Sequence, residues 1–246
     1  MEIFASLCLE GSPIDDTIFK RISSQVLSIF NKKSVDCFRF ERNITEADIK
    51  EHWDILEGVK DVYVGPKTVS SDEMTLVIER FKKLNNLIII PRVPEEFTGL
   101  EGLKLNTLYL EAENSISLPS LERIQADSLL MQKQCCENWE LNFFIKNCIR
   151  SSGEAKKNRP TAFCIFNAEL NSSILDGVNH RKWNPNRRSQ FYVIYVKNGP
   201  MVIDCADGFD IYRSDGTLAT VVIKDNSSFN FLIWTERFPK IPVYNV

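Results

Sequence analysis

A short apolar pattern that recurs along the first half of the chain is the feature that most constrains its fold. The pattern is apolar-x-x-apolar-x-apolar, and its first positions lie 24, 25, 21 and 21 residues apart. Its occurrences are Val35/Phe38/Phe40, Val59/Val62/Val64, Leu84/Leu87/Ile89, Leu105/Leu108/Leu110 and Ala126/Leu129/Met131. Such a period, with one short strand per unit, is typical of leucine-rich repeats. We therefore expect a degenerate leucine-rich-repeat-like stack of parallel strands.

Helix-start signals lie between the early strands. In each signal a serine or threonine stands three residues before an acidic residue, which is the spacing of a capping box. The pairs are Ser12/Asp15, Thr45/Asp48 and Ser70/Glu73. We expect a first helix that runs to about Asn31, and further helices after Thr45 and Ser70.

The second half of the chain breaks the repeat. Apolar residues at helical spacing predict an amphipathic helix between residues 135 and 152, and they are Leu141, Phe144, Ile145, Cys148 and Ile149. A strand is expected over Thr161–Ala168. The stretch Asn179–Ser189 is rich in arginine and lysine, and it is expected to be a solvated basic loop rather than a nucleic-acid contact.

Three turn signals then separate runs of β-branched and aromatic residues. They are Asn198-Gly199, Asp207-Gly208 and Asp215-Gly216, dipeptides that favour two-residue hairpin turns with positive φ. The runs are Phe191–Val196, Met201–Cys205, Phe209–Arg213, Thr217–Ile223 and Phe229–Trp234. We expect an α/β protein with repeats over residues 1–132 and an antiparallel β-meander domain over 133–246.

Composition narrows the cellular setting. A net charge of -3 argues against a dedicated nucleic-acid binder, which would show a basic face. No apolar run is long enough to span a bilayer, and the start of the chain lacks the features of a secretory signal. The seven cysteines form no CxxC pair, as expected of reduced thiols. We expect an intracellular protein, in the cytoplasm or nucleus, without nucleic-acid or membrane partners.

Few residues offer catalytic chemistry. The histidines are His52 and His180, and no cysteine or histidine pair has metal-ligand spacing apart from the adjacent Cys135-Cys136, which we interpret as core-lining. No glycine-rich phosphate loop or nucleophile elbow is present. We expect no enzyme activity, no cofactor and no metal.

The residues between the apolar positions of the repeat predict a binding surface. Because side chains alternate along a strand, these middle residues should form one row on the face away from the apolar positions. They are Arg39, Tyr63, Ile88, Tyr109 and Leu130, flanked by Glu41, Asp61 and Glu111. Tyrosine and arginine are frequent at interface hot spots, so the row is a candidate protein-binding site. In the alternative reading, the last helix or the basic loop covers the row, and Ile88 and Leu130 are core.

Four segments of the second half together resemble a known family. They are LNFFIK at 141–146, ILDGV at 174–178, DIYRSDGTLAT at 210–220 and FLIW at 231–234. This set resembles the type 2 F-box-associated domain of the large nematode F-box protein expansion. The resemblance covers about the last 110 residues, and the upstream repeats are similar to the region that precedes this domain in those proteins.

The resemblance implies a role in protein recognition. Such proteins hold substrates for a Skp–cullin–F-box ubiquitin ligase, so the implied partner is an unknown protein substrate. We expect this chain to lack the F-box itself and to meet the Skp adaptor only if an F-box lies upstream. The alternative is an unrelated leucine-rich-repeat interaction scaffold without a ubiquitin role.

Overall fold

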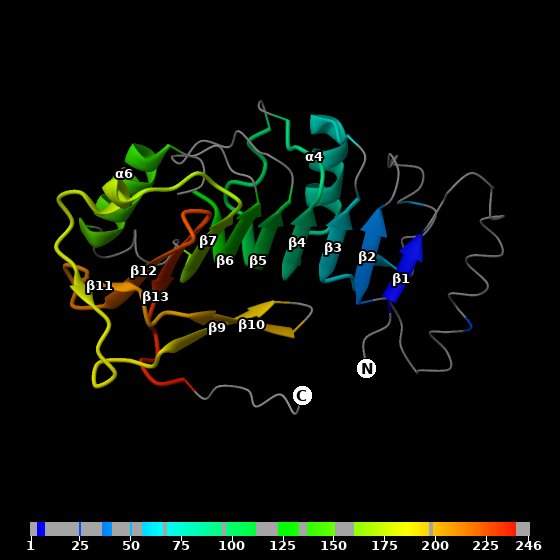
Figure 1. Ribbon diagram of the computed structural model, residues 1–246. Helices are drawn as coiled ribbons and strands as arrows, with labels where there is room; N and C mark the ends of the chain where they lie inside the picture. The colour runs from blue at the N-terminus through cyan, green and yellow to red at the C-terminus, as the bar shows by residue number, and fades with distance from the viewer. Residues whose placement is uncertain are drawn as a thin grey trace.

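The computed structural model describes residues 4–7, 25, 36–40, 50, 56–65, 68–94, 97–111, 123–132, 137–150, 160–196 and 199–239. Over these residues the chain is a mixed α/β protein, as the sequence predicts. Figure 1 shows one large sheet running the length of the molecule, from β1 at one end to β11 near the other.

That sheet contains eleven strands in the order β1-β2-β3-β4-β5-β6-β7-β13-β12-β11-β8. Its first seven strands are parallel: β1 Phe4–Leu7, β2 Cys37–Phe40, β3 Asp61–Val64, β4 Asn86–Ile89, β5 Lys104–Leu110, β6 Gln125–Gln132 and β7 Ala162–Phe166. The others are antiparallel: β13 Ser228–Ile233, β12 Leu218–Lys224, β11 Phe209–Tyr212 and β8 Arg181–Lys182. Strands β2 to β6 lie at the five predicted positions. The sequence did not predict β1, which lies upstream of the predicted repeats.

The apolar pattern marks one face of the sheet, as predicted. Its members all belong to one buried cluster wherever their side chains are described. They are Val59, Leu84, Leu105 and Ala126 at the first position, Phe38, Val62, Leu87, Leu108 and Leu129 at the second, and Val64, Ile89, Leu110 and Met131 at the third. Full burial of such a side chain stabilises the fold by about 1.5–3 kcal/mol.

A recurring bulge explains why two residues, and not one, separate the first apolar position from the second. In three successive strand pairs, one carbonyl accepts hydrogen bonds from two consecutive amides of the next strand. The sets are Asp36 with Lys60 and Asp61, Lys60 with Asn85 and Asn86, and Asn85 with Asn106 and Thr107. Two residues opposite one is the count of a β-bulge, which shifts the alternation by one residue. Val59 and Val62 therefore face the same side.

In the described part of the chain, the helices α4 and α6 cover the apolar face (Figure 1). Helix α4, Ser71–Arg80, begins at the predicted capping box: the Ser70 hydroxyl accepts from the Glu73 amide at 3.2 Å, and the Ser70 amide donates to the Glu73 carboxylate at 2.8 Å. Helix α6, Asn138–Arg150, is the predicted amphipathic helix. The ring of Phe144 meets the rings of Phe163 and Phe231 edge-on, which fixes α6 over β7 and β13.

The opposite face of the sheet carries a hairpin. Strands β9, Phe191–Val196, and β10, Gly199–Asp204, pair only with each other in the described residues. Figure 1 shows this hairpin on the side of the sheet away from α4 and α6. The five strands predicted for the meander are thus present, but only β11, β12 and β13 form a continuous meander.

The turn at Asp215-Gly216 differs in type from the prediction. Among the described residues around this turn only Gly216 has positive φ, at 78°, so the turn is not of the primed type. The Gly216 amide donates to the Arg213 carbonyl and the Arg213 amide to the Thr217 carbonyl. This is a three-residue loop with a bulged glycine. The primed turn lies instead at Asp225-Asn226, where φ is 52° and 51°.

The turn at Asp207-Gly208 also differs from the prediction, because it moves the chain between sheets. The Gly208 amide donates to the Cys205 carbonyl at 3.0 Å, and β10 and β11 on either side belong to different sheets. Gly208 does not have positive φ. A Cβ there would lie 2.7 Å from Cγ2 of Thr220, so close packing and not backbone twist requires glycine.

Several predictions fall outside the described residues: the helix from Ser12 to Asn31, most of the helix after Thr45, and the Cys135-Cys136 pair. The predicted division at 132/133 stays a prediction. The sheet itself crosses that position, because β6 pairs with β7 in parallel. No helix in the described part of the chain is both long and apolar enough to cross a bilayer.

Candidate protein-binding face

The five predicted binding residues lie in one row across the sheet. Strand register pairs Arg39 with Tyr63, Tyr63 with Ile88, Ile88 with Tyr109, and Tyr109 with Leu130. The next member on β7 is Cys164. The row alternates with the residues of the apolar cluster, so it lies on the face away from α4 and α6. The predicted alignment is therefore confirmed, and the name central row is used for these five residues.

The hairpin β9–β10 covers one end of the central row. Leu130 is buried in a second cluster that contains Cys164 of β7 and Ile194 of β9, with Tyr109 packed against it. Ile88 and Leu130 are 8% and 6% exposed, whereas Arg39, Tyr63 and Tyr109 are half-buried. The alternative prediction is that the last helix or the basic loop covers the central row. In the structure neither of these covers it, and the hairpin β9–β10 packs on the Tyr109–Leu130 end instead. Strands β2 and β3 therefore carry the more accessible end.

A polar row runs beside the central row, two residues earlier in each strand. Its polar members are Asp61, Asn86, Thr107 and Ser128, and Cys37 and Ala162 stand at its two ends. The side-chain amide of Asn86 donates to the Asp61 carboxylate at 2.7 Å. Asp61 was expected to be part of a charged rim, but it is only 7% exposed and serves this strand-to-strand contact. The flanking Glu41 lies outside the described residues.

Tyr109 is held in the row by its neighbours. The Gln132 side-chain amide donates to the Tyr109 hydroxyl at 2.5 Å. Burial, followed by the negative charge of Glu111, raises the pKa of Tyr109, while the Gln132 contact lowers it. The hydroxyl therefore stays protonated at neutral pH and remains able to donate a hydrogen bond.

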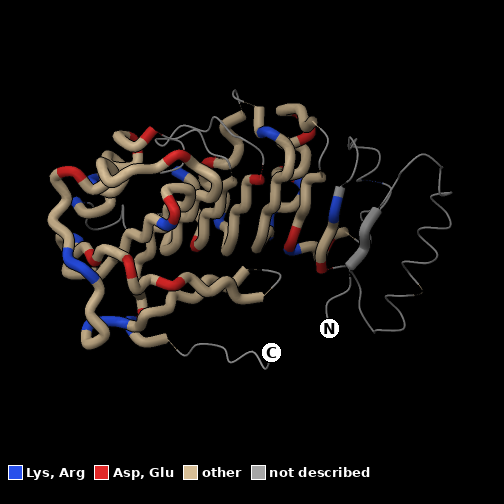
Figure 2. The backbone as a smooth tube through the Cα atoms, in the orientation of Figure 1, with Lys and Arg blue, Asp and Glu red and all other residues tan. Residues whose placement is uncertain are grey.

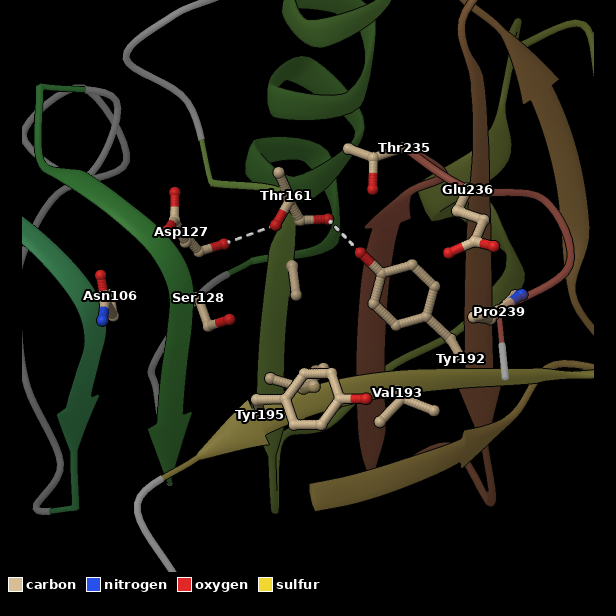
Figure 3. Close-up of a pocket in the computed structure, with 12 residues that line it drawn as sticks. Asn106, Asp127, Ser128, Thr161, Tyr192, Val193, Tyr195, Thr235, Glu236 and Pro239 are labelled. Carbon is tan, nitrogen blue, oxygen red and sulfur yellow. Dashed lines mark hydrogen bonds between the residues drawn. The ribbon is translucent and has the colours of Figure 1, made fainter. Parts of the chain in front are cut away.

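A pocket of about 860 Å³ opens beside the polar row, and sequence reasoning did not find it. Its walls are Asn106 of β5, residues 127–128 of β6, residues 161–162 at the start of β7, strand β9 and the segment 235–239 that follows β13 (Figure 3). The lining residues are Asn106, Asp127, Ser128, Thr161, Ala162, Tyr192, Val193, Ile194, Tyr195, Thr235, Glu236 and Pro239. We call it the strap pocket. No local motif joins residues from these five separate segments, so the sequence carries no signal for it.

Hydrogen bonds fix the floor of the strap pocket. The Tyr192 hydroxyl donates to the Ile233 carbonyl at 3.0 Å and lies 3.4 Å from the Thr161 carbonyl. The Thr161 hydroxyl donates to the Asp127 carbonyl at 2.8 Å. Burial raises the pKa of Tyr192 to about 12, so the hydroxyl keeps its proton at neutral pH. Strand β9 is thereby tied to β7 and β13.

A buried polar network joins Arg188, Asp210, Thr220 and Trp234. Arg188, which is fully buried, donates from Nε to Oδ1 of Asp210 at 2.7 Å. The Thr220 hydroxyl donates to the same oxygen at 3.0 Å, and the Trp234 indole donates to Thr220 at 2.8 Å. The Arg188 guanidinium lies 5.0 Å from the centre of the Trp234 ring. Asp210, Thr220 and Trp234 all belong to the segments that carry the family resemblance.

This network corrects the expectation of a wholly solvated basic loop. Figure 2 shows basic segments near β11, at the end of the molecule away from β1. Arg181 and Lys182 are exposed there, but they form strand β8 against β11. Arg188, in contrast, is buried. Its guanidinium donates to the carbonyls of Ser189 and Cys205 as well as to Asp210. Composition alone could not separate the exposed cations from the buried one.

The cysteines and the histidine described in the structure have structural surroundings. Cys37, Cys148, Cys164 and Cys205 are buried, and none of them is in a disulfide with another described residue. Burial raises the pKa of Cys164, and it raises that of Cys205 to about 12. His180 bonds the Val178 carbonyl through Nδ1 at 2.7 Å and packs edge-on against Phe209. The described residues contain no group of three possible metal ligands.

Comparison with known proteins gives relatives without an assigned role. No family model matches the chain, and no solved structure matches it. Uncharacterized protein F59B2.8 of Caenorhabditis elegans is 24% identical over 220 residues, which cover 87% of this chain and 48% of that protein. Uncharacterized protein F59B2.9 of the same organism is 25% identical over 177 residues, or 68% and 39%. The chain thus spans half or less of the length of these relatives.

Proposed function

We propose that this chain is a non-catalytic protein-binding module resembling the substrate-recognition part of an SCF ubiquitin-ligase receptor. The observation that carries the proposal is the central row. Arg39, Tyr63 and Tyr109 are half-buried and stand in register on one face of the sheet. The buried cluster around the hairpin β9–β10 includes no residue of β2 or β3, at one end of this row. Arginine and tyrosine are among the side chains enriched at interface hot spots.

The parallel strands favour a leucine-rich-repeat-like description of the first half. Strands β2 to β6 follow one another along the sheet in chain order, and the shared-carbonyl bulge recurs between them. We propose that these units are degenerate repeats, and that β11 to β13 belong to a type 2 F-box-associated domain. The buried network of Arg188, Asp210 and Thr220 supports the second point because it gives the resembling residues a shared structural role.

The protonation and contacts of the described cysteines and histidine favour a binding role over a catalytic one. The thiols of Cys164 and Cys205 are buried and have raised pKa values, so they are protonated and poor nucleophiles at neutral pH. His180 is engaged with Val178 and Phe209.

The test compares protein partners captured by variants of the central row. The double variant Tyr63→Ala/Tyr109→Ala removes both tyrosines, and Tyr63→Ala alone spares the residue that packs against the hairpin. Thr75→Ala, on the exposed side of α4, is the matched control. A partner that binds wild type and control, but not Tyr63→Ala at unchanged melting temperature, supports the proposal. Retention of every partner by the double variant argues against it.

The ubiquitin-ligase part needs its own measurement. The purified chain is mixed with the Skp adaptor and analysed by size exclusion. We expect no stoichiometric complex with these 246 residues. A stable complex would place adaptor docking within this chain and make it a receptor by itself.

A further inference from the structure

We propose that the strap pocket receives a cationic side chain, arginine foremost, from an extended segment of the partner protein. The inference rests on the proposed protein-binding function and names the chemistry of the partner. It is carried by the charge, the hydrogen-bonding state and the aromatic wall of the pocket.

The charge of the strap pocket is wholly negative. Asp127 and Glu236 line it, and no lysine, arginine or histidine does. Both residues are exposed, and neither carboxylate forms an ion pair with another residue that the structure describes. A cation entering between them therefore gains attraction without displacing a cation of the protein.

The neutral polar groups also favour a ligand rich in hydrogen-bond donors. The hydroxyls of Thr161 and Tyr192 direct their hydrogens to the carbonyls of Asp127 and Ile233. Because each hydroxyl is engaged as a donor, it can offer an incoming ligand only its oxygen, as an acceptor. A guanidinium carries five N–H donors and no acceptor, so it matches this set better than an anion or a neutral ligand does.

An aromatic wall completes the strap pocket. The side chain of Tyr195 is 70% exposed and lies beside Val193 in Figure 3. A cation over a tyrosine face is attracted by the ring, and arginine stacks there more readily than lysine because its guanidinium is planar and more weakly hydrated. The volume of about 860 Å³ exceeds that of one guanidinium, so neighbouring residues of an extended segment fit as well.

The experiment titrates the full chain with N-acetyl-arginine N-methylamide and follows NMR shifts. The matched uncharged ligand is the citrulline analogue, which has nearly the same shape. We expect a dissociation constant of about 1 mM for the arginine ligand and at least about tenfold weaker binding of the citrulline ligand. Added salt should weaken the arginine complex because the attraction is between charges in a solvent-accessible pocket.

Protein variants locate the binding. Asp127→Asn and Glu236→Gln should each weaken the arginine ligand by about fivefold, while Glu79→Gln on α4 should leave it unchanged. Tyr195→Leu should weaken binding, and Tyr195→Phe, which keeps the ring, should not. Equal binding of both ligands, no saturable binding of arginine, or insensitivity to both carboxamide changes would overturn the proposal.

The outcome is separable from that of the protein-binding proposal. If the arginine ligand fails to bind while Tyr63→Ala still abolishes partner capture, the pocket inference alone is wrong. If the arginine ligand binds as expected but central-row variants retain every partner, the central row is wrong and the pocket stands as an isolated cation site.

Discussion

Arg188 and Asp210 form an ion pair with both side chains fully excluded from solvent, at 2.7 Å between Nε and Oδ1. Breaking such a pair by removing one partner leaves an uncompensated buried charge, which typically costs about 3–5 kcal/mol. We therefore expect Asp210→Asn to lower the free energy of unfolding by that order, measured by urea denaturation. Arg188→Met should cost less, because Asp210 keeps Arg187 at 3.9 Å. Arg181→Met, at an exposed position, is the control.

The double variant Arg188→Met/Asp210→Asn tests the coupling. If the single changes destabilise because a charge is stranded, the double change should cost clearly less than the sum of the two. Strict additivity would show that the residues act separately and that the ion pair does not organise this region.

The stability cost of replacing Gly216 should depend only on how well the new residue adopts a positive φ. Its φ is 78°, and a Cβ there would meet nothing within 4 Å, so space is not the constraint. We expect Gly216→Val to destabilise by about 1–2 kcal/mol, because a β-branched residue is strained at positive φ, and Gly216→Asn to cost much less. An unchanged melting temperature in the valine variant would contradict the loop geometry.

Gly208 presents the opposite case. Its φ is ordinary, but a Cβ would lie 2.7 Å from Cγ2 of Thr220 and 3.0 Å from the Cys205 carbonyl oxygen. We expect Gly208→Ala to destabilise by about 1–3 kcal/mol through overpacking. Adding Thr220→Ser removes the methyl group and keeps the hydroxyl, so it should recover part of the loss. Calorimetric melting temperatures of the four proteins measure the cycle.

The buried thiol of Cys205 should make stability fall in alkaline solution. Its pKa is raised from 9.0 to about 12, so the unfolded chain loses this proton first. The contribution is complete below pH 9 and declines as pH rises toward 12. Urea titrations across that range should show a decline that is shallower in Cys205→Ala. Equal slopes in both proteins would mean that the thiol is not protected.

The sequence predicted best where a regular pattern is tied to local geometry. The apolar positions of β2 to β6, the capping box of Ser70 and Glu73, and the face of α6 all follow from strand or helix periodicity. The alignment of the central row followed as well, since register carries one residue of each strand onto the next.

What depends on long-range packing could not be predicted. Asp207-Gly208 and Asp215-Gly216 look alike as dipeptides, yet one moves the chain between sheets and the other closes a hairpin. Arg188 looks like the nearby Arg181 and Lys182 in the sequence, and only the fold places it beside Asp210 and the carbonyls of Ser189 and Cys205. Asp127 and Glu236 come together in the strap pocket because β6 and the segment after β13 meet across β7.

The place of β13 in the sheet also bears on synthesis. This strand is the last in the sequence among those described, yet it lies between β7 and β12 in the interior of the sheet. While the ribosome is still translating residues 167–227, β7 has its parallel partner but not its antiparallel one. An unpaired strand edge of this kind invites association with other chains. Translation proceeds at about 5–20 residues per second, so β13 becomes available to close this edge only seconds after β7 has been made.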